Sequence, residues 1–391
     1  MWLLPWTTTF LWCVIDSFGR ELKSLATTTN AAYVRAMNGV IYLHRRDLRL
    51  EDNRSLVAAA EMAEESGGWL LLLALWDPKD DAVVRETSSP RLGPGYRRYW
   101  RASVDELADT YRELGQHLVR ATATAADAVS LIKQQFAPHE EITVVTPRVP
   151  GTEEANSLRE ISACTGIPVV TPDSTTLLAI EDVPGTFSSF RNKVERDSLA
   201  VPAPTQRPEH LPPPPPWATE LGELLPSVVA VTPGPPRATL SESPSAGGRS
   251  TAIARLRDFV WDSGALRTYK ETRNGLLGTH FSSRLSAPLA HGTLSAREVW
   301  QEVKANEDQL GPNESTYWLG FELLWRDFFH FQAYAWGDRF FSYSGYGSHA
   351  RPLAPRGLST GPADPQVFHR WITGTTGDAL VDAALLTSST P

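Results

Sequence analysis

Short apolar runs of strand length recur through the first half of the chain, and the segments between them have the periodicity of helices. The runs are VIYLH (40–44), WLLLLALW (69–76), HLVRA (117–121), ITVVT (142–146) and IPVVT (167–171). Strands buried on both faces have such continuous hydrophobic composition, whereas strands with one solvated face alternate. The pattern therefore predicts a parallel, doubly wound α/β domain over residues 39–185.

The first apolar run leads into a charged segment, HRRDLRLEDN, at residues 44–53. Taken alone, Arg45, Arg46 and Asp47 indicate a charged strand exit, with Asp52 as the cap of a helix that begins at Asn53. No GxGxxG sequence follows this strand, which argues against a dinucleotide site in the sheet domain itself.

Proline, glycine and serine dominate residues 200–248, with LPPPPPW at 211–217 and VTPGPPRATLSESPSAGG at 231–248. Proline removes a backbone donor, and glycine and serine add freedom, so we expect no interior helix or strand here. The composition predicts a linker over residues 186–249 that wraps one domain to reach the other. The alternative is a PxxP ligand for a partner domain.

Hydroxyl side chains gather in HFSSRLSAPLAHGTLS, at residues 280–295. Ser282, Ser283 and Ser286 offer donors beside the backbone amides of a short loop, and Arg284 adds a fixed positive charge. A diphosphate needs that combination, particularly at the start of a helix, and the alternative is a serine-rich turn. A helix is predicted shortly before this segment by apolar residues at helical spacing: Ile253, Leu256, Phe259 and Val260.

A second candidate motif is FELLWRDFFHF, at residues 321–331. Glu322, Trp325 and Arg326 occupy neighbouring positions on one helix, because residues three and four apart share a face. A structural Glu–Arg ion pair is the alternative to a functional site. The remaining apolar stripe predicts core packing, by Phe321, Leu324 and Phe328.

Composition narrows the function classes only a little. The two cysteines, Cys13 and Cys164, are far apart and no histidines cluster, so neither a disulfide framework nor a metal site is expected. The net charge of -8 means that any nucleic-acid contact must come from a local basic face. Residues 1–38 begin with an apolar stretch that is too short for a membrane span and lacks a basic start. They are either a transit segment for a mitochondrion or plastid, or an unstructured extension. In the second case we expect the protein in the cytoplasm or nucleus.

The two C-terminal motifs, together with Arg-Asp-Leu-Arg-x-x-Asp-Asn at residues 46–53, resemble the photolyase and cryptochrome family, closest to the DASH cryptochromes. The resemblance implies an α/β plus all-α fold, with a Rossmann-like sheet domain, a linker, and a helical FAD-binding domain over residues 250–391. It also implies that segment 46–53 joins the two domains. The implied FAD contacts are Tyr269, Ser282, Ser283, Arg284, Leu285, Ser286 and Arg326.

The activity that the resemblance implies is light-driven electron transfer. Excited reduced FAD passes an electron to a cyclobutane pyrimidine dimer, the ring splits, and the electron returns. Glu322 and Trp325 are the implied catalytic residues: the tryptophan gives the flipped lesion an apolar wall, and a glutamate held protonated by burial donates to its carbonyl edge. The expected partner is DNA, chiefly single-stranded or dimer-containing. No contact with a membrane is expected. Blue-light reception is the other implied role.

Two departures from the family modify these expectations. Family members run on well beyond Pro391, so the helical domain is expected to be partial, with FAD held poorly or not at all and no measurable dimer repair. DASH proteins have a glutamate where this chain has Val149, which weakens the expectation of a 5,10-methenyltetrahydrofolate antenna. The alternative functions are a non-enzymatic regulatory or interaction protein that has lost FAD binding, and a nucleotide binder similar to electron-transfer flavoproteins, which the absent glycine loop disfavours.

Overall fold

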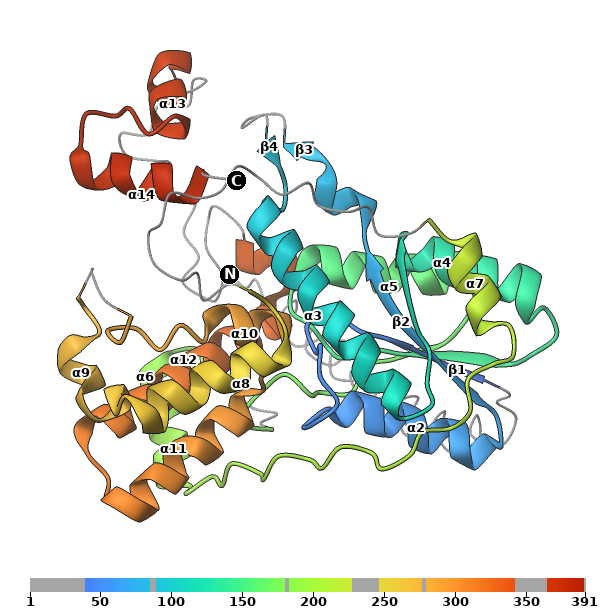
Figure 1. Cartoon of the computed structure of the whole chain (residues 1–391), viewed down its shortest axis with the longest axis horizontal. Helices are drawn as coiled ribbons and strands as arrows, with labels where there is room; N and C mark the ends of the chain where they lie inside the picture. The colour runs from blue at the N-terminus through green and yellow to red at the C-terminus, as the bar shows by residue number, and fades with distance from the viewer. Residues whose placement is uncertain are drawn as a thin grey trace, which may run out of the picture.

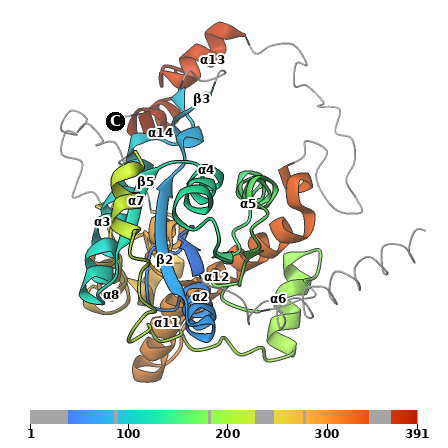
Figure 2. The ribbon, with the colours of Figure 1, turned by 90° about the vertical axis from the view of Figure 1, so that its right-hand side faces the viewer.

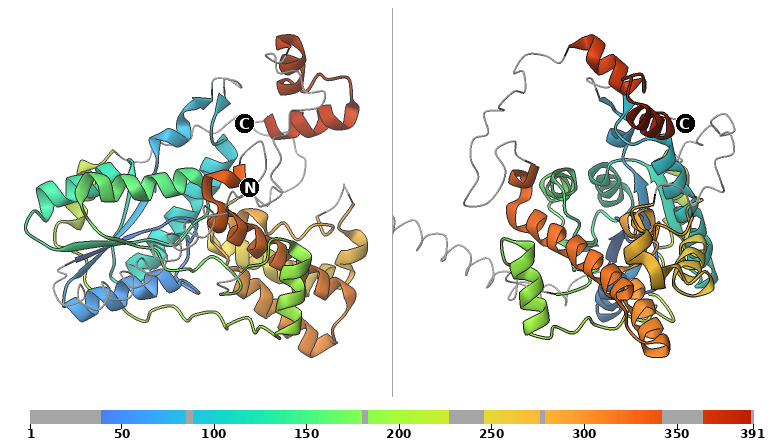
Figure 3. Two further views of the ribbon diagram at one scale, coloured as in Figure 1. Left: turned by 180° about the vertical axis from the view of Figure 1, so that it is seen from behind. Right: turned by 90° about the vertical axis from the view of Figure 1, so that its left-hand side faces the viewer.

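The structure, a computed structural model, describes residues 39–84, 89–179, 183–226, 246–275, 279–341 and 364–389 (Figure 1). The extension predicted over residues 1–38 lies outside them, as does most of the proline- and glycine-rich run at 231–248. A sheet domain and a helical domain lie side by side, and the chain between them runs along the edge of both (Figures 1 and 3).

Five parallel strands form the sheet in the order β5-β2-β1-β6-β7, so that the direction of succession reverses between β1 and β6. Each strand coincides with one predicted apolar run to within a few residues, and the predicted doubly wound parallel sheet is confirmed. The strands are β1 (Gly39–Leu43), β2 (Trp69–Trp76), β5 (Leu118–Thr122), β6 (Ile142–Val145) and β7 (Val169–Val170).

Helices cover both faces of the sheet because alternate side chains of each strand point to opposite sides. Val40 and Tyr42 of β1 pack against α2 (Arg54–Ser66) and α3 (Pro94–Glu113). The opposite face packs against α4 (Ala125–Leu131), α5 (Thr152–Thr165) and α7 (Ala218–Leu224), and Figure 2 shows α4 and α5 beside β2. Short elements complete the domain: η1 (Pro78–Asp81), β3 (Val83–Val84) with its antiparallel partner β4 (Ser89–Pro90), and η2 (Ile132–Phe136).

Part of the predicted linker is folded. Residues 201–217 contain neither helix nor strand, as the prolines predict, but they lie against the sheet domain. The Leu70 amide donates to Pro213 O (3.0 Å), and Gln116 Nε2 donates to Pro212 O (2.7 Å). Two helices fall within the predicted 186–249 boundaries: α6 (Phe187–Arg196), which packs in the helical domain, and α7, which packs on the sheet.

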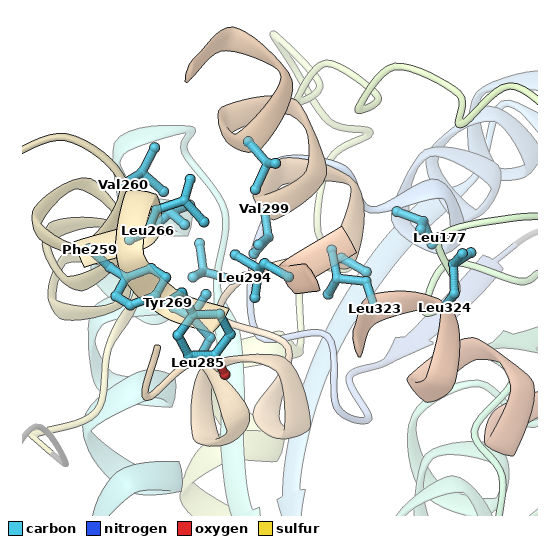
Figure 4. Packing of buried hydrophobic residues seen from close by; sticks show 14 of the residues in the cluster. Leu177, Phe259, Val260, Leu266, Tyr269, Leu285, Leu294, Val299, Leu323 and Leu324 are labelled. Atoms are coloured by element: carbon cyan, nitrogen blue, oxygen red, sulfur yellow. The ribbon is translucent and has the colours of Figure 1, made fainter. Parts of the chain in front are cut away.

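The helical domain is built around α12 (Glu314–Trp336), whose first turn is capped by Asn313. Its core, part of which Figure 4 shows, draws side chains from α6, α8, α11 and α12. Of the predicted stripe before the serine segment, Leu256, Phe259 and Val260 are buried in this core, whereas Ile253 is 40% exposed. The other elements are α8 (Arg249–Arg257), η3 (Asp258–Asp262), η4 (Ala265–Thr268), α9 (Tyr269–Thr272), α10 (Ser286–His291), α11 (Ala296–Leu310) and η5 (Gly337–Phe341).

Segment 46–53 joins the two domains through buried polar contacts. Asp52, predicted to cap α2, instead pairs with Arg297 of α11 at 2.9 Å, and the cap is Asn53, whose side chain accepts from the Leu56 amide. Arg49 Nη1 donates to Gly292 O at 2.9 Å. These contacts fix the angle at which the helical domain meets the carboxyl ends of the strands.

The last described residues form the helix pair α13 (Pro365–Ile372) and α14 (Ala379–Ser389). The Asp382 carboxylate accepts from the amides of Thr376 (2.7 Å) and Gly377 (3.0 Å), which fixes the turn before α14. Among the helices that the structure describes, none combines the length and the apolar character needed to cross a membrane.

Candidate functional site

Two cavities lie where the helical domain meets the sheet. The first, of about 280 Å³, is the strand-end cavity, at the carboxyl ends of β1, β2 and β6. The second, of about 400 Å³, is the interdomain cavity, between segment 283–290, α12 and the loops of the sheet domain. Arg46 and Val149 line both. In doubly wound sheets, ligands bind where the strand order reverses, and the strand-end cavity lies at that point.

One face of α12 forms a wall of the interdomain cavity. Positions spaced by three or four residues share this face, and it combines apolar and charged groups. Five residues of the segment 283–290 form the facing wall, and Thr175 and Pro150 close the cavity from the sheet domain. The α12 residues are Leu319, Glu322, Leu323, Arg326 and His330; those opposite are Ser283, Leu285, Ser286, Leu289 and Ala290.

The predicted FAD contacts divide into two groups. Ser283, Leu285, Ser286 and Arg326 line the interdomain cavity together, although Arg326 lies on a different element from the other three. Tyr269, Ser282 and Arg284 do not line it. Arg284 adopts a left-handed backbone conformation (φ 55°), and its amide donates to Ser282 Oγ at 3.3 Å.

Sequence reasoning missed the residue that holds this loop. Arg255 of α8 donates to the carbonyl oxygens of Ser282 (2.7 Å), Ser283 (3.0 Å) and Thr279 (3.0 Å). Three bonds from one guanidinium fix the backbone of the loop that brings Ser283 and Ser286 to the interdomain cavity. The sequence contained no signal for this role, because Arg255 looks like an ordinary charged position on a helix.

Glu322 is the acceptor at the centre of a four-residue network. Tyr269 Oη donates to Glu322 Oε2 (2.9 Å), Trp318 Nε1 donates to Oε1 (3.1 Å), and Arg273 Nη1 lies 3.9 Å away. Burial, and then the nearby Glu322 carboxylate, raises the pKa of Tyr269. The Glu322 side chain is 35% exposed and both its oxygens accept, so it differs from the buried, proton-donating glutamate that we expected from the sequence.

Trp325 does not line the interdomain cavity that contains Glu322. Its ring stacks on Phe187 of α6, with centroids 3.5 Å apart and planes 9° apart, and it also stacks on Phe329. The tryptophan that contacts Glu322 is Trp318. The two implied catalytic residues therefore lie on adjacent sides of α12 rather than at one cavity. Leu324 and Phe328 are buried in the hydrophobic core, as predicted, and the partly buried Phe321 packs against it.

Arg326 is held by the sheet domain. Its Nη1 donates to Thr175 O at 2.7 Å and lies 3.6 Å from the Asp327 carboxylate. Burial lowers the pKa of Arg326, against the opposing effect of Asp327. A structural ion pair between Glu322 and Arg326, the alternative considered from the sequence, is not formed among the described residues. Nearby, His330 Nδ1 is buried and has no hydrogen-bond partner among them.

The strand-end cavity has a charged rim and an aromatic wall. Its carboxylates are largely paired: Arg46 with Glu154 at 2.7 Å and Arg91 with Glu153 at 3.2 Å. His291 lies between the rings of Tyr96 and Tyr99, with centroid distances of 4.2 and 4.5 Å, and burial lowers its pKa to about 4. We did not predict this cavity from the sequence. The reversal of strand order would have located it.

The residues of the interdomain cavity fit a flavin dinucleotide. Ser283 and Ser286 offer hydroxyl donors, Arg46 and Arg326 offer positive charge, and leucines line the remaining walls. A diphosphate needs hydroxyl donors and positive charge, and a planar ring needs apolar walls. The cavity volume of about 400 Å³ lies within the range of small-molecule sites. The unsatisfied His330 Nδ1 is a further polar atom on the same wall.

Comparisons of the sequence with known proteins agree on one family. The sequence model of the DNA photolyase family matches residues 40–213. The chain is 33% identical over 356 residues to the cryptochrome DASH of Gloeobacter violaceus, covering 88% of this chain and 67% of that protein. A relative from Ostreococcus tauri, named "Cryptochrome DASH, chloroplastic/mitochondrial", is 30% identical over 388 residues, covering 88% of this chain and 67% of the relative.

Solved structures agree. The crystal structure of a Synechocystis cryptochrome superposes with a TM-score of 0.70 and 30% sequence identity, covering 90% of this chain and 71% of that one. The chain thus spans about two thirds of the length of the curated relatives.

Proposed function

Because the chain belongs to the DASH cryptochromes of the DNA photolyase family, we propose that it binds FAD in the interdomain cavity and acts on pyrimidine dimers in DNA under blue light. The observation that carries this proposal is the convergence of Ser283, Ser286 and Arg326 on one cavity that also contains Glu322. FAD, when bound, supplies the light-driven electron transfer that splits the cyclobutane ring.

The chain's own residues bind and orient the cofactor. The hydroxyls of Ser283 and Ser286 donate to phosphate oxygens, and the Arg326 guanidinium, held by Thr175, presents fixed positive charge. Leu285 and Leu323 supply apolar surface and exclude water from the same cavity. Arg255 holds the serine loop in place through its backbone carbonyls, so these donors need little reorganisation on binding.

The Glu322 network is the proposed contact to the lesion. A pyrimidine dimer presents ring N–H donors as well as carbonyl acceptors, and a carboxylate accepts from the former. Tyr269 and Trp318 hold the two carboxylate oxygens in position, and the Tyr269 hydroxyl stays protonated because its pKa is raised. A dimer in single-stranded DNA reaches such a site at the lowest cost, since no base pair has to open.

A second candidate is blue-light reception without repair. It is favoured by the position of Trp325, which stacks on Phe187 and leaves the cavity beside Glu322 without that aromatic wall. The two candidates share the FAD site and differ in whether a flipped dimer is bound. A non-enzymatic role without FAD is the remaining alternative.

A folate antenna is the candidate occupant of the strand-end cavity. The Tyr96 ring and the carboxylates Asp80 and Glu153 suit a planar heterocycle that carries N–H donors. Val149, which lines this cavity, brings no further carboxylate. We expect 5,10-methenyltetrahydrofolate to bind more weakly here than in a protein with glutamate at that position.

Residues 1–38 are proposed as an organelle address. Their apolar start and the serine and threonine residues that follow support this, as does the name of the Ostreococcus tauri relative. Fusion of these residues to a fluorescent protein should direct it to a plastid or mitochondrion. Diffuse cytoplasmic fluorescence would contradict the assignment.

The experiment that tests the main proposal is repair of an ultraviolet-irradiated oligothymidine by the reduced, FAD-loaded protein under blue light. The proposal predicts recovery of undamaged thymine, with none in the dark, in place of the poor FAD retention expected from the sequence alone. Reversible flavin photoreduction without recovery would favour light reception. A protein that binds no FAD would contradict both and favour the non-enzymatic alternative.

A further inference from the structure

Arg46 lines both cavities, the interdomain cavity together with Arg326 and the strand-end cavity together with Glu154. We infer that Arg46 is a cofactor-positioning residue, which pairs with Glu154 when the interdomain cavity is empty and moves to the diphosphate when FAD binds. This inference rests on the proposed function. It assigns a cofactor contact to a residue that the sequence presented as part of a charged strand exit and of the segment joining the two domains.

The backbone of Arg46 is held rigidly. Its φ of 58° lies in the left-handed region, which non-glycine residues adopt only where their surroundings impose it. Gly292 of the helical domain packs so closely that a Cβ on it would lie 2.0 Å from Arg46 O. The Leu48 amide donates to His291 O at 3.3 Å. The left-handed conformation therefore directs the Arg46 side chain to the wall between the two cavities.

The side chain itself is held much less firmly. Its charged partner among the described residues is Glu154, with Nη2 to Oε1 at 2.7 Å. The Arg46 side chain is 47% exposed and that of Glu154 is 16% exposed. Because the Arg46 guanidinium is nearly half exposed, solvent already screens its side of the ion pair. A stronger acceptor in the neighbouring cavity can therefore take the guanidinium at small cost.

Arg326 supplies only part of the positive charge that a diphosphate in the interdomain cavity needs. Arg326 faces Asp327 at 3.6 Å, and its Nη1 is used by Thr175 O. The Arg326 guanidinium is thus already engaged within the protein, whereas a diphosphate carries two negative charges. Arg46 is the other arginine on this cavity wall, so it is the group that can balance the remainder.

The electrostatic influence of Arg46 already extends to both cavities. Burial, and then the Arg46 charge, lowers the pKa of His291, which lines the strand-end cavity. Burial, then Arg326 and then Arg46, lowers the pKa of His330, which lines the interdomain cavity. The guanidinium is therefore close enough to act on an anion in the second cavity.

Movement of Arg46 would couple the two cavities. When its guanidinium leaves, the Glu154 carboxylate is unpaired on the strand-end cavity and becomes free to accept a hydrogen bond there. A ligand with N–H donors would then bind the strand-end cavity more tightly in the presence of FAD. Because such coupling is reciprocal, it would tighten FAD binding by the same factor.

The test is equilibrium titration of the full chain with FAD, ADP and riboflavin, followed by fluorescence quenching for the flavins and calorimetry for ADP. Arg46→Gln should weaken FAD and ADP about five- to tenfold, the loss of one charge-assisted hydrogen bond, and leave riboflavin unchanged. Glu154→Gln should tighten FAD and ADP about threefold, because it frees Arg46 from a partly exposed pair. Arg91→Gln is the matched control, since Arg91 lines the strand-end cavity but not the interdomain cavity, and it pairs with Glu153.

The outcomes separate the inference from the proposed function. Wild-type protein that binds neither FAD nor ADP overturns both. If wild type binds FAD and Arg46→Gln binds it equally well, the inference is overturned but the FAD site stands. The same holds if Glu154→Gln binds FAD no more tightly than wild type. Equal losses in Arg46→Gln and Arg91→Gln would also overturn it, because they would show a general charge effect. Unchanged thermal melting of each variant confirms that the comparison is made on folded protein.

Discussion

Glu322 is the residue whose surroundings differ most from the sequence-based expectation. Its carboxylate accepts from Tyr269 and Trp318, and it lies on the interdomain cavity. We expect Glu322→Ala to lower the rate of dimer splitting about tenfold, through loss of one charged hydrogen-bonding group at the lesion. FAD affinity should change less than about twofold, because the proposed phosphate contacts remain.

The control for this change is Glu314→Ala. Glu314 lies in the first turn of the same helix and pairs with Lys270 at the surface. Neither repair nor FAD binding should respond to it. Equal losses of repair and FAD binding in Glu322→Ala would show that Glu322 is a structural residue.

Asp327 is a buried carboxylate that ties α12 to the sheet domain. It accepts from the amides of Leu177 and Leu178, both at 2.9 Å. Asparagine offers one acceptor oxygen, so Asp327→Asn leaves a buried amide unpaired and should cost about 1–3 kcal/mol in the free energy of unfolding. Urea denaturation measures this directly.

The pH dependence of stability provides a second test at Asp327. Burial, opposed by Arg326 and the two amides, raises the pKa of Asp327 to about 7 from 3.8. Between these values the folded protein holds a proton that the unfolded chain releases, so this contribution to stability falls as pH rises. Wild type should therefore lose stability relative to Asp327→Asn across that window. Parallel stability curves for the two proteins would show that the carboxyl ionises at its ordinary pKa.

Residue roles were predictable from sequence only where a local motif carried them. Ser283, Ser286 and Arg326 were named from short segments, and they line one cavity. Arg255 and Thr175 could not be named, because their contribution is a contact across the fold: one holds the serine loop, and the other holds Arg326 through its carbonyl.

At the scale of elements, α7 extends the sheet domain beyond the boundary predicted at residue 185. Leu221 is fully buried against the sheet, whereas Leu224, on the same helix, is 53% exposed. We expect Leu221→Ala to destabilise the protein by about 2–4 kcal/mol, the cost of removing a buried leucine side chain. Leu224→Ala should change stability by less than about 0.5 kcal/mol.

The measurement is chemical denaturation followed by tryptophan fluorescence, since Trp217 packs on the same face of the sheet. Similar small losses in both variants would mean that α7 is not part of the cooperative unit.

The strands were predictable, whereas the helices α6 and α7 within the predicted linker were not. Each strand is a continuous apolar run, because both its faces are covered by helices. α6 and α7 span only 10 and 7 residues, so each presents too few apolar positions to show a helical period within a proline-rich region. Tertiary packing, through Phe187 and Phe190 of α6 and Leu221 of α7, determines both helices.

At the scale of the whole molecule, function depends on how two domains meet. The interdomain cavity gathers segments near residues 46, 149, 175, 286 and 326, which no local pattern could bring together. Buried polar contacts such as Asp52–Arg297 and Arg49–Gly292 fix that junction. The resemblance to a family predicted that these segments form one FAD site. The junction between the domains shows which of the predicted residues line the interdomain cavity.

The most direct test of the central claim, that the interdomain cavity is the flavin site, is an FAD titration of wild type against a cavity-filling variant. Ser286→Trp would place an indole in the interdomain cavity, and Asn156→Trp would place one in the strand-end cavity. We predict saturable FAD binding by wild type, loss of binding in Ser286→Trp, and unchanged affinity in Asn156→Trp. FAD affinity that is unaffected by Ser286→Trp, or abolished by Asn156→Trp alone, would contradict the account.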